Sequence, residues 1–151
     1  MFGATHIIVG AAIGAFCPNF WLAGLLGLLS HATLDAIPHE DYDFDHPSMP
    51  TLVARGAFDF GTGLALAALV FTLSPDKTNI AVGATFGALP DIIDIGFIYG
   101  PLHTNIFFTR IHQNIHWFLQ NKKWRPNFAV SFSLQVTLIV AALAAWFFFK
   151  H

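Results

Sequence analysis

Charge-free apolar runs alternate with polar segments along the chain, and these runs predict its helices. The runs cover residues 7–30, 60–74, 78–90 and 128–149. The last run is the plainest, because as a helix it is long enough to cross the roughly 30 Å of hydrocarbon in a bilayer. The aromatic residues 146–149, directly before Lys150, predict a belt at the membrane interface.

The first run is interrupted by Cys17, Pro18 and Asn19. A residue that precedes proline avoids the helical region, so the interruption predicts a tight turn. We therefore expect a helical hairpin with arms at about residues 5–16 and 20–35, while one kinked helix over residues 7–30 is the alternative. The arms are short for a full crossing, so they would span a thinned bilayer or enter only part of it.

Two polar segments lie outside the runs. Residues 37–50 form a loop with prolines, and residues 102–126 form an amphipathic stretch that contains Arg110. Both are expected at the water interface. Glycines recur at helical spacing inside the runs, which lets membrane helices approach closely; the pairs are Gly10 with Gly14, Gly24 with Gly27, and Gly83 with Gly87.

Composition makes a membrane the expected setting. Hydrophobic residues make up 55% of the chain and charged residues 11%, whereas a soluble domain has about 25% charged residues. A soluble domain of this size buries only about 70% of its surface, so lipid must cover much of the apolar remainder. We expect one all-α membrane domain over residues 1–151, with about five apolar helices and an interfacial amphipathic helix. The net charge of -2 and the lack of a basic stripe exclude nucleic acid as a partner.

The order of the runs predicts where polar side chains gather. If the chain crosses at each run and the first run is a hairpin, one side receives His6, His31, Asp35, Asp59, Asp91, Asp94, His112 and His116. Arg55, Arg110 and the basic residues of 122–125 share that side, against Lys77 and Lys150 on the other. The positive-inside rule then makes this side cytoplasmic, with the N-terminus inside and the C-terminus outside.

These eight side chains are the predicted metal ligands. Ionisable groups at membrane depth persist mainly when they pair, bind metal or line a water-filled cavity. Three pairs have a helical spacing that points two ligands in one direction: His31 with Asp35, Asp91 with Asp94, and His112 with His116. Imidazole together with carboxylate suits Zn²⁺ first, with Mn²⁺ or Fe²⁺ as alternatives. The number of ligands allows one ion or two, and two ions would clamp an attacking and a leaving oxygen.

Several of these residues also have a purely structural interpretation. Asp91, directly after Pro90, could cap the start of a helix. His31 could be a hydrogen-bonded histidine of the bundle, and the histidines of residues 102–126 could face water. Asp59 is harder to explain in this way, because it lies between two phenylalanines at the start of an apolar run.

Four further residues are candidates for catalysis and substrate binding. His39 and Glu40 follow the second arm of the hairpin closely, and either could be a further ligand or the general base for a metal-bound water. The aspartates after them alternate as in a calcium-binding loop. The glycine and the distal glutamate of an EF-hand are missing, so an EF-hand is excluded. Arg55 and Arg110 could clamp a phosphate with their planar guanidinium groups, or anchor the chain at the interface.

Three stretches in the first two-thirds of the chain resemble the metal-dependent hydrolases of bacterial and archaeal inner membranes. They are His6 with Gly10 and Gly14, residues 30–41 (SHATLDAIPHED), and residues 88–94 (ALPDIID). The resemblance implies a multi-helix membrane protein with a metal site and a hydrolase activity. It carries over as shared polar residues His6, His31, Asp35, His39, Asp91 and Asp94. Many members have a closer pair of aspartates followed by histidine, whereas here two isoleucines separate the aspartates, which leaves the identity and number of the ions open.

Together these features predict a metal-dependent hydrolase in a prokaryotic inner membrane, with its site facing the cytoplasm. The metal would activate water and polarise the electrophile, and the favoured substrate is a phosphoester of an amphiphilic membrane lipid. One alternative is a transporter of a metal ion or a proton, which would carry polar residues through the midplane, where this chain has few. The other is a structural membrane subunit in which metal staples the helices. Homo-oligomerisation is left open.

Overall fold

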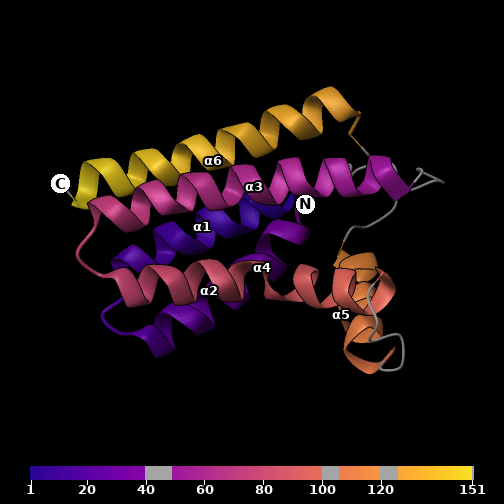
Figure 1. The fold of residues 1–151 in the computed structure, drawn as a ribbon, viewed down its shortest axis with the longest axis horizontal. Coiled ribbons are helices and arrows are strands. Elements are labelled where there is room, and N and C mark those ends of the chain that lie inside the picture. Colours follow the sequence, from indigo (N-terminus) through magenta and orange to yellow (C-terminus); the bar gives the residue numbers. More distant parts are fainter. Residues whose placement is uncertain (40–48, 100–105, 120–125, 151) are drawn as a thin grey trace.

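The computed structural model describes residues 1–39, 49–99, 106–119 and 126–150, and over these ranges the chain is helical with no strand. The helices follow one another in the order α1 (Gly3–Phe16), α2 (Phe20–Asp35), α3 (Met49–Leu73), α4 (Lys77–Tyr99), α5 (Ile106–Leu119) and α6 (Phe128–Lys150) (Figure 1). The predicted all-helical class is therefore confirmed.

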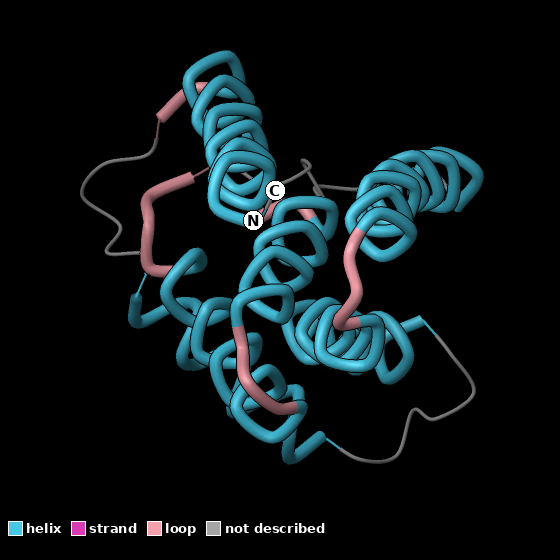
Figure 2. The backbone as a smooth tube through the Cα atoms, turned by 90° about the vertical axis from the view of Figure 1, so that its left-hand side faces the viewer, coloured by secondary structure: helices cyan, strands magenta, loops and turns pink. Residues whose placement is uncertain are grey.

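Consecutive long helices run in opposite directions, so the bundle has two distinct ends (Figure 1). The N-terminus, the last turn of α2 and the helix α5 lie at one end, where the Met1 amino group contacts Asp35 and His31 contacts His112. The C-terminus lies at the other end, where Lys150 pairs with Asp76 between α3 and α4. α1 is the central helix, because it packs against α2, α3, α4 and α6. Figure 2 shows this arrangement with the helices nearly end-on.

The predicted hairpin at the start of the chain is confirmed. α1 ends at Phe16 and α2 begins at Phe20, so the chain turns at residues 17–19 and the single kinked helix is excluded. The Asn19 side chain caps α2 by accepting a hydrogen bond from the backbone N–H of Leu22 at 3.0 Å. Asn79 of α4 donates to the carbonyl of Cys17, which ties the turn to the bundle.

Glycines set the distance between α1 and α4. A Cβ added at Gly10 would lie 2.3 Å from the carbonyl oxygen of Gly83, and a Cβ at Gly14 would lie 2.3 Å from that of Asn79. Backbone atoms cannot rotate away as a side chain can, so only glycine fits at these positions. The close helix approach that the glycine spacing predicts is thus present between α1 and α4.

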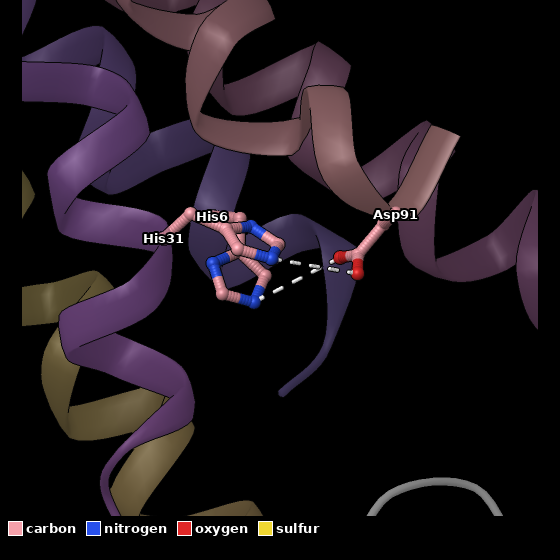
Figure 3. Close-up of side chains that lie close together, drawn as sticks. All are labelled: His6, His31 and Asp91. Carbon is pink, nitrogen blue, oxygen red and sulfur yellow. Dashed lines mark ion pairs between the residues drawn. The ribbon is translucent and has the colours of Figure 1, made fainter. Parts of the chain in front are cut away.

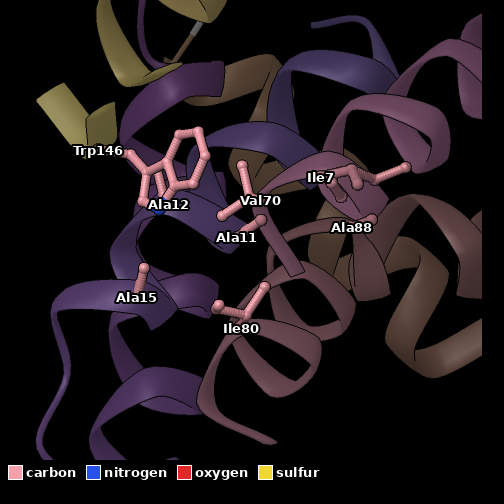
Figure 4. Close-up of a cluster of buried hydrophobic side chains, with 9 residues drawn as sticks. Ile7, Ala11, Ala12, Ala15, Val70, Ile80, Ala88 and Trp146 are labelled. Atoms are coloured by element: carbon pink, nitrogen blue, oxygen red, sulfur yellow. The ribbon is translucent and has the colours of Figure 1, made fainter. Parts of the chain in front are cut away.

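The core lies around α1, in a cluster of buried side chains that includes Ile7, Val70, Ile80 and Trp146 (Figure 4). Trp146 is 3% exposed, and its indole Nε1 donates to Ser74 Oγ at 2.8 Å. The prediction that Trp146 belongs to an interfacial belt is therefore wrong, because its ring fills the core. The three phenylalanines that follow it are exposed.

Two helices extend beyond the apolar runs that predict them. α3 begins at Met49, ten residues before Asp59, so this aspartate lies inside the helix instead of at its start. α4 continues through Pro90 to Tyr99. Asp91 is thus an interior residue of α4, and the alternative in which it caps the start of a helix is wrong.

Within the described ranges, two helices are long and apolar enough to cross a membrane: Val53–Leu73 of α3 and Phe128–Lys150 of α6. Their apolar windows are only 22% and 11% buried inside the chain, so most of their surface is left for contact with the surroundings. α1 and α2, with 14 and 16 residues, are shorter than the roughly 20 residues of a full crossing. Among the described helices only α3 and α6 have the length and apolarity of a crossing helix, so the expected set of about five crossing helices is not confirmed.

Candidate metal centre

Histidines and aspartates from four helices meet at the end of the bundle that holds the N-terminus. Among the described residues, two groups of three side chains could each hold a metal ion. Within each group, the ligand atoms all lie within 4.8 Å of one another. The groups are His6 with His31 and Asp91, and His31 with Asp35 and His112. α1, α2, α4 and α5 supply these residues, which are far apart in sequence. The convergence that the alternating crossings predict is present for these five residues.

His31 and His112 face each other with their Nε2 atoms 3.0 Å apart. His31 Nδ1 lies 2.8 Å from the carbonyl oxygen of Gly87, and His112 Nδ1 lies 2.8 Å from Asp94 Oδ2. A carbonyl or carboxylate oxygen only accepts hydrogen bonds, so each Nδ1 carries a proton and donates it. When a ring is neutral, its Nε2 is then a lone pair that points into the space that the two rings share. This is the arrangement in which outer partners orient metal-binding histidines.

Two facing lone pairs at this distance repel each other unless a cation or a proton lies between them. Burial lowers the pKa of His112, but its hydrogen bonds with Asp35 and Asp94 outweigh burial and raise the pKa from 6.5 to about 9. In the metal-free protein, His112 therefore carries a second proton, which Nε2 can donate to His31. A metal ion at this position would take the place of that proton.

Asp35 is the central carboxylate of the cluster and is 2% exposed. Its Oδ2 lies 3.1 Å from His31 Nε2 and 3.6 Å from His112 Nε2. With bonds of about 2.0–2.1 Å to zinc, donor atoms on one ion are about 2.9 to 3.4 Å apart in octahedral or tetrahedral geometry. The spacing of these three donors is thus close to that of ligands on one ion, and the donor set fits a divalent transition metal.

His6 forms the buried wall of the cluster (Figure 3). Its ring is 0% exposed and stacks on His31 with the ring centroids 4.1 Å apart. His6 Nε2 lies 3.2 Å from Asp35 Oδ1 and 3.8 Å from Asp91 Oδ2. Neither ring nitrogen of His6 makes a hydrogen bond, which is rare for a buried imidazole.

The local sequence of α4 prepares one wall of the cluster. Pro90 has no N–H, so the helical hydrogen bond to the carbonyl of Phe86, four residues earlier, is missing in the turn beside Gly87. His31 uses the carbonyl of Gly87 in this turn as its acceptor. Gly87 also lets α1 approach, because a Cβ there would lie 2.6 Å from the carbonyl oxygen of His6.

Asp59, a predicted ligand, has a different role in the structure. Its two carboxylate oxygens accept hydrogen bonds from the backbone N–H groups of Gly3 and Ala4, at 2.8 and 3.0 Å. Asp59 therefore caps the N-terminus of α1 from α3, where a negative charge is favourable. It belongs to neither group of candidate ligands.

The other predicted site residues are distributed differently. His39 is buried and its Nδ1 donates to the carbonyl of Ile37 at 2.6 Å, and it belongs to neither group. Arg55 and Arg110 are exposed. Glu40 lies outside the described residues, and so does the side chain of His116, although His116 itself is on α5. The roles predicted for these residues stay predictions.

Two groups that contribute to the site were not predicted from the sequence, the carbonyl of Gly87 and the amino group of Met1. A third, Asp94, was predicted with a different role. Gly87 orients His31 through its carbonyl, and only the nearby Pro90 signals an unusual helix turn. The amino group of Met1 lies 3.0 Å from Asp35 Oδ1, a contact that no sequence pattern indicates. Asp94, predicted as a ligand, instead hydrogen bonds to His112 through Oδ2.

Comparisons of this chain with protein-family models, with curated proteins and with solved structures found no match.

Proposed function

We propose that the chain is an integral membrane protein and a metal-dependent hydrolase, which acts on a phospholipid-like substrate at the cytoplasmic interface. One observation carries the proposal. His31 and His112 point two oriented Nε2 atoms at each other, 3.0 Å apart, beside the Asp35 carboxylate. The opposite nitrogens of both rings are held by acceptors from α4, as outer partners hold the histidines of metal centres, and the three donors are spaced as ligands on one ion would be. The resemblance of the sequence to inner-membrane metal-dependent hydrolases supports the same function.

Exposed apolar side chains support the membrane setting. α3 and α6 carry large exposed residues such as Phe58, Leu64, Phe132 and Val140, which lipid would cover. The two arginines Arg55 and Arg110 lie on helices next to the site, and Lys77 and Lys150 lie toward the opposite end. The positive-inside rule then orients the metal centre toward the cytoplasm.

The cluster is fully buried on one side and partly exposed on the other. His6 and His31 are buried, whereas the side chains of Asp91 and His112 are 22% and 18% exposed. A bound divalent metal would lower the pKa of a water and polarise a phosphoester. Asp94 would hold the His112 ring in place, and His6 would exclude water from the buried side.

α5 supports an amphiphilic substrate. It carries His112 toward the cluster and also exposes Phe107, Ile111, Ile115 and Phe118. Such a helix rests in the headgroup region of a bilayer with its apolar side toward the acyl chains. The site would then meet lipid phosphates without removing the lipid from the membrane, and Arg110 on the same helix could contact the phosphate.

Hydrolysis by the purified protein tests this proposal. Detergent-solubilised protein is stripped of metal, reloaded with Zn²⁺ or Mn²⁺, and given phosphatidic acid and phosphatidylglycerol in mixed micelles. We expect metal-dependent release of phosphate or phosphoglycerol, with a loss of at least about a hundredfold in His112→Gln, as when a catalytic group is removed. Asp76→Asn, at the other end of the bundle, is the matched control and should keep full activity. Activity that survives in His112→Gln, or that needs no metal, would contradict the proposal.

A second candidate function is a metal that only staples the bundle, because the candidate ligands come from α1, α2, α4 and α5. The same variants separate the two functions. His112 is on the partly exposed side of the cluster, so in the hydrolase the His112→Gln protein stays folded and loses turnover. If metal only staples the helices, wild-type protein shows no turnover, and metal removal or His112→Gln lowers the unfolding temperature strongly.

A further inference from the structure

The two oxygens of Asp35 face different nitrogen donors. Oδ2 lies 3.1 Å from His31 Nε2 and 3.6 Å from His112 Nε2, whereas Oδ1 lies 3.2 Å from His6 Nε2. Oδ1 also accepts a hydrogen bond from the Met1 amino group at 3.0 Å, which leaves its second lone pair on the His6 side. Asp91 extends the cluster beyond His6, with Oδ2 3.8 Å from His6 Nε2 and Oδ1 3.8 Å from His31 Nε2. One carboxylate therefore stands between two pairs of ligands.

His31 is common to both candidate groups but can serve only one ion. Its Nδ1 donates to the Gly87 carbonyl, so a single lone pair on Nε2 remains. Two ions in this cluster could not both bind His31. They could both bind Asp35, because a carboxylate has an oxygen for each.

His6 gives an independent indication of a ligand on its side of the cluster. Its ring is fully buried, and neither nitrogen makes a hydrogen bond although Asp35 and Asp91 are nearby. Buried polar atoms without a partner are costly and rare, and they often mark a site for a ligand or an ion. An ion beside His6 would give Nε2 a partner, and the Asp91 carboxylate would bind the same ion.

We infer that the site holds two divalent transition-metal ions bridged by Asp35. His31 and His112 would hold the first ion with Oδ2, and His6 and Asp91 would hold the second with Oδ1. Each ion then has three protein ligands and an open position, which is the pattern of catalytic sites. A pair of ions suits a phosphoester, since it can contact the attacking and the leaving oxygen. The inference rests on the metal centre of the proposed function and specifies its ligand partition.

Manganese binding to metal-free, full-length protein in detergent tests the inference without any activity measurement. Bound Mn²⁺ is counted after equilibrium dialysis by elemental analysis, and electron paramagnetic resonance reports whether the ions are coupled. Wild-type protein should bind two Mn²⁺ per chain with an exchange-coupled spectrum, as expected for ions about 3.5 to 4 Å apart. Asp91→Ala, at a partly exposed helical position, should bind one Mn²⁺ with an uncoupled spectrum. Asp76→Ala is the matched control and should bind two coupled ions.

Wild-type protein that binds one Mn²⁺, or two without coupling, would overturn the inference. Two coupled ions retained in both Asp91→Ala and His6→Gln would overturn the ligand assignment. Because the wild-type measurement is decisive by itself, a variant that fails to fold does not remove the test. Two coupled ions without phosphoester hydrolysis would leave this inference standing and reject the hydrolase. One ion with metal-dependent hydrolysis would do the reverse.

Discussion

Gly10→Ala should destabilise the bundle by pushing α1 away from α4. The new Cβ would lie 2.3 Å from the Gly83 carbonyl oxygen, and ordinary van der Waals contact begins at 3.4 Å, so the helices must separate by about 1 Å. Overpacking a filled interface costs about 1–3 kcal/mol. The upper part of this range is expected here, because both crowded groups belong to rigid helix backbones.

Gly61→Ala is the matched control, since a Cβ at Gly61 in α3 meets nothing within 4 Å. Alanine is favoured over glycine inside a helix by about 1 kcal/mol, and both variants gain this amount. The difference in unfolding free energy between the two variants therefore isolates the steric cost, and we expect Gly10→Ala to be less stable by about 2–3 kcal/mol. Reversible unfolding in mixed detergent micelles, followed by circular dichroism, measures it.

The same substitution should weaken metal binding. His6 lies one helical turn before Gly10 on α1, so a 1 Å displacement of the helix also moves His6 relative to His31 and Asp35. We expect a lower Mn²⁺ affinity in Gly10→Ala and an unchanged affinity in Gly61→Ala. Equal stability of the two variants would refute the packing argument, because the glycine contact would then have no steric consequence.

Four further outcomes are expected. Asp59→Ala removes the acceptor for two N–H groups of α1 and should cost about 1–3 kcal/mol of stability in chemical unfolding; a lower metal stoichiometry in dialysis would instead restore Asp59 as a ligand. Asp94→Asn should lower metal affinity by about ten- to a hundredfold, because it loosens the orientation of His112; unchanged affinity in a metal titration would count against that role. Zn²⁺ at about a hundred times its Kd should stabilise the protein by about 2.7 kcal/mol in thermal unfolding, and a chelator should reverse this; no shift would argue against the metal centre. Trp146→Phe should cost about 1 kcal/mol through the lost hydrogen bond to Ser74, whereas Phe148→Leu, at an exposed ring, should be neutral in the same assay.

Apolar periodicity and turn chemistry made much of the fold predictable. Residues 17–19 contain a proline and an asparagine, so a break in the first run follows from local rules. Only the structure decided that the break is the turn of a hairpin and no kink in a single helix. Helix ends were harder to predict where polar residues continue a helix. Pro90 and Asp59 lie inside α4 and α3, because contacts with neighbouring helices outweigh their local preferences. Burial was misjudged for Trp146, since a sequence pattern does not distinguish lipid from core.

Five of the eight predicted ligands fall into the two candidate groups, and their convergence follows from the order of the helices. An alternating path returns every second helix end to the same side, so His31, Asp35, Asp91 and His112 were expected at one end of the bundle, and His6 joins them because the first run is a hairpin. Asp59 shares that end too, yet it caps α1 instead. Helix order specifies the end of a bundle but not the direction of a side chain.

The sequence alone determined the helical class, the break at residues 17–19, the small residues at the helix crossing and most of the polar residues at one end. These features depend only on the pattern of residues along the chain, and packing between distant segments is not needed to predict them. Only the tertiary structure decided that two imidazoles turn their Nε2 atoms toward each other beside Asp35. That geometry depends on acceptors from other helices, the carbonyl of Gly87 and the carboxylate of Asp94, which hold the opposite nitrogens. A hydrogen bond between distant segments exists only once packing has brought its two partners within about 3 Å.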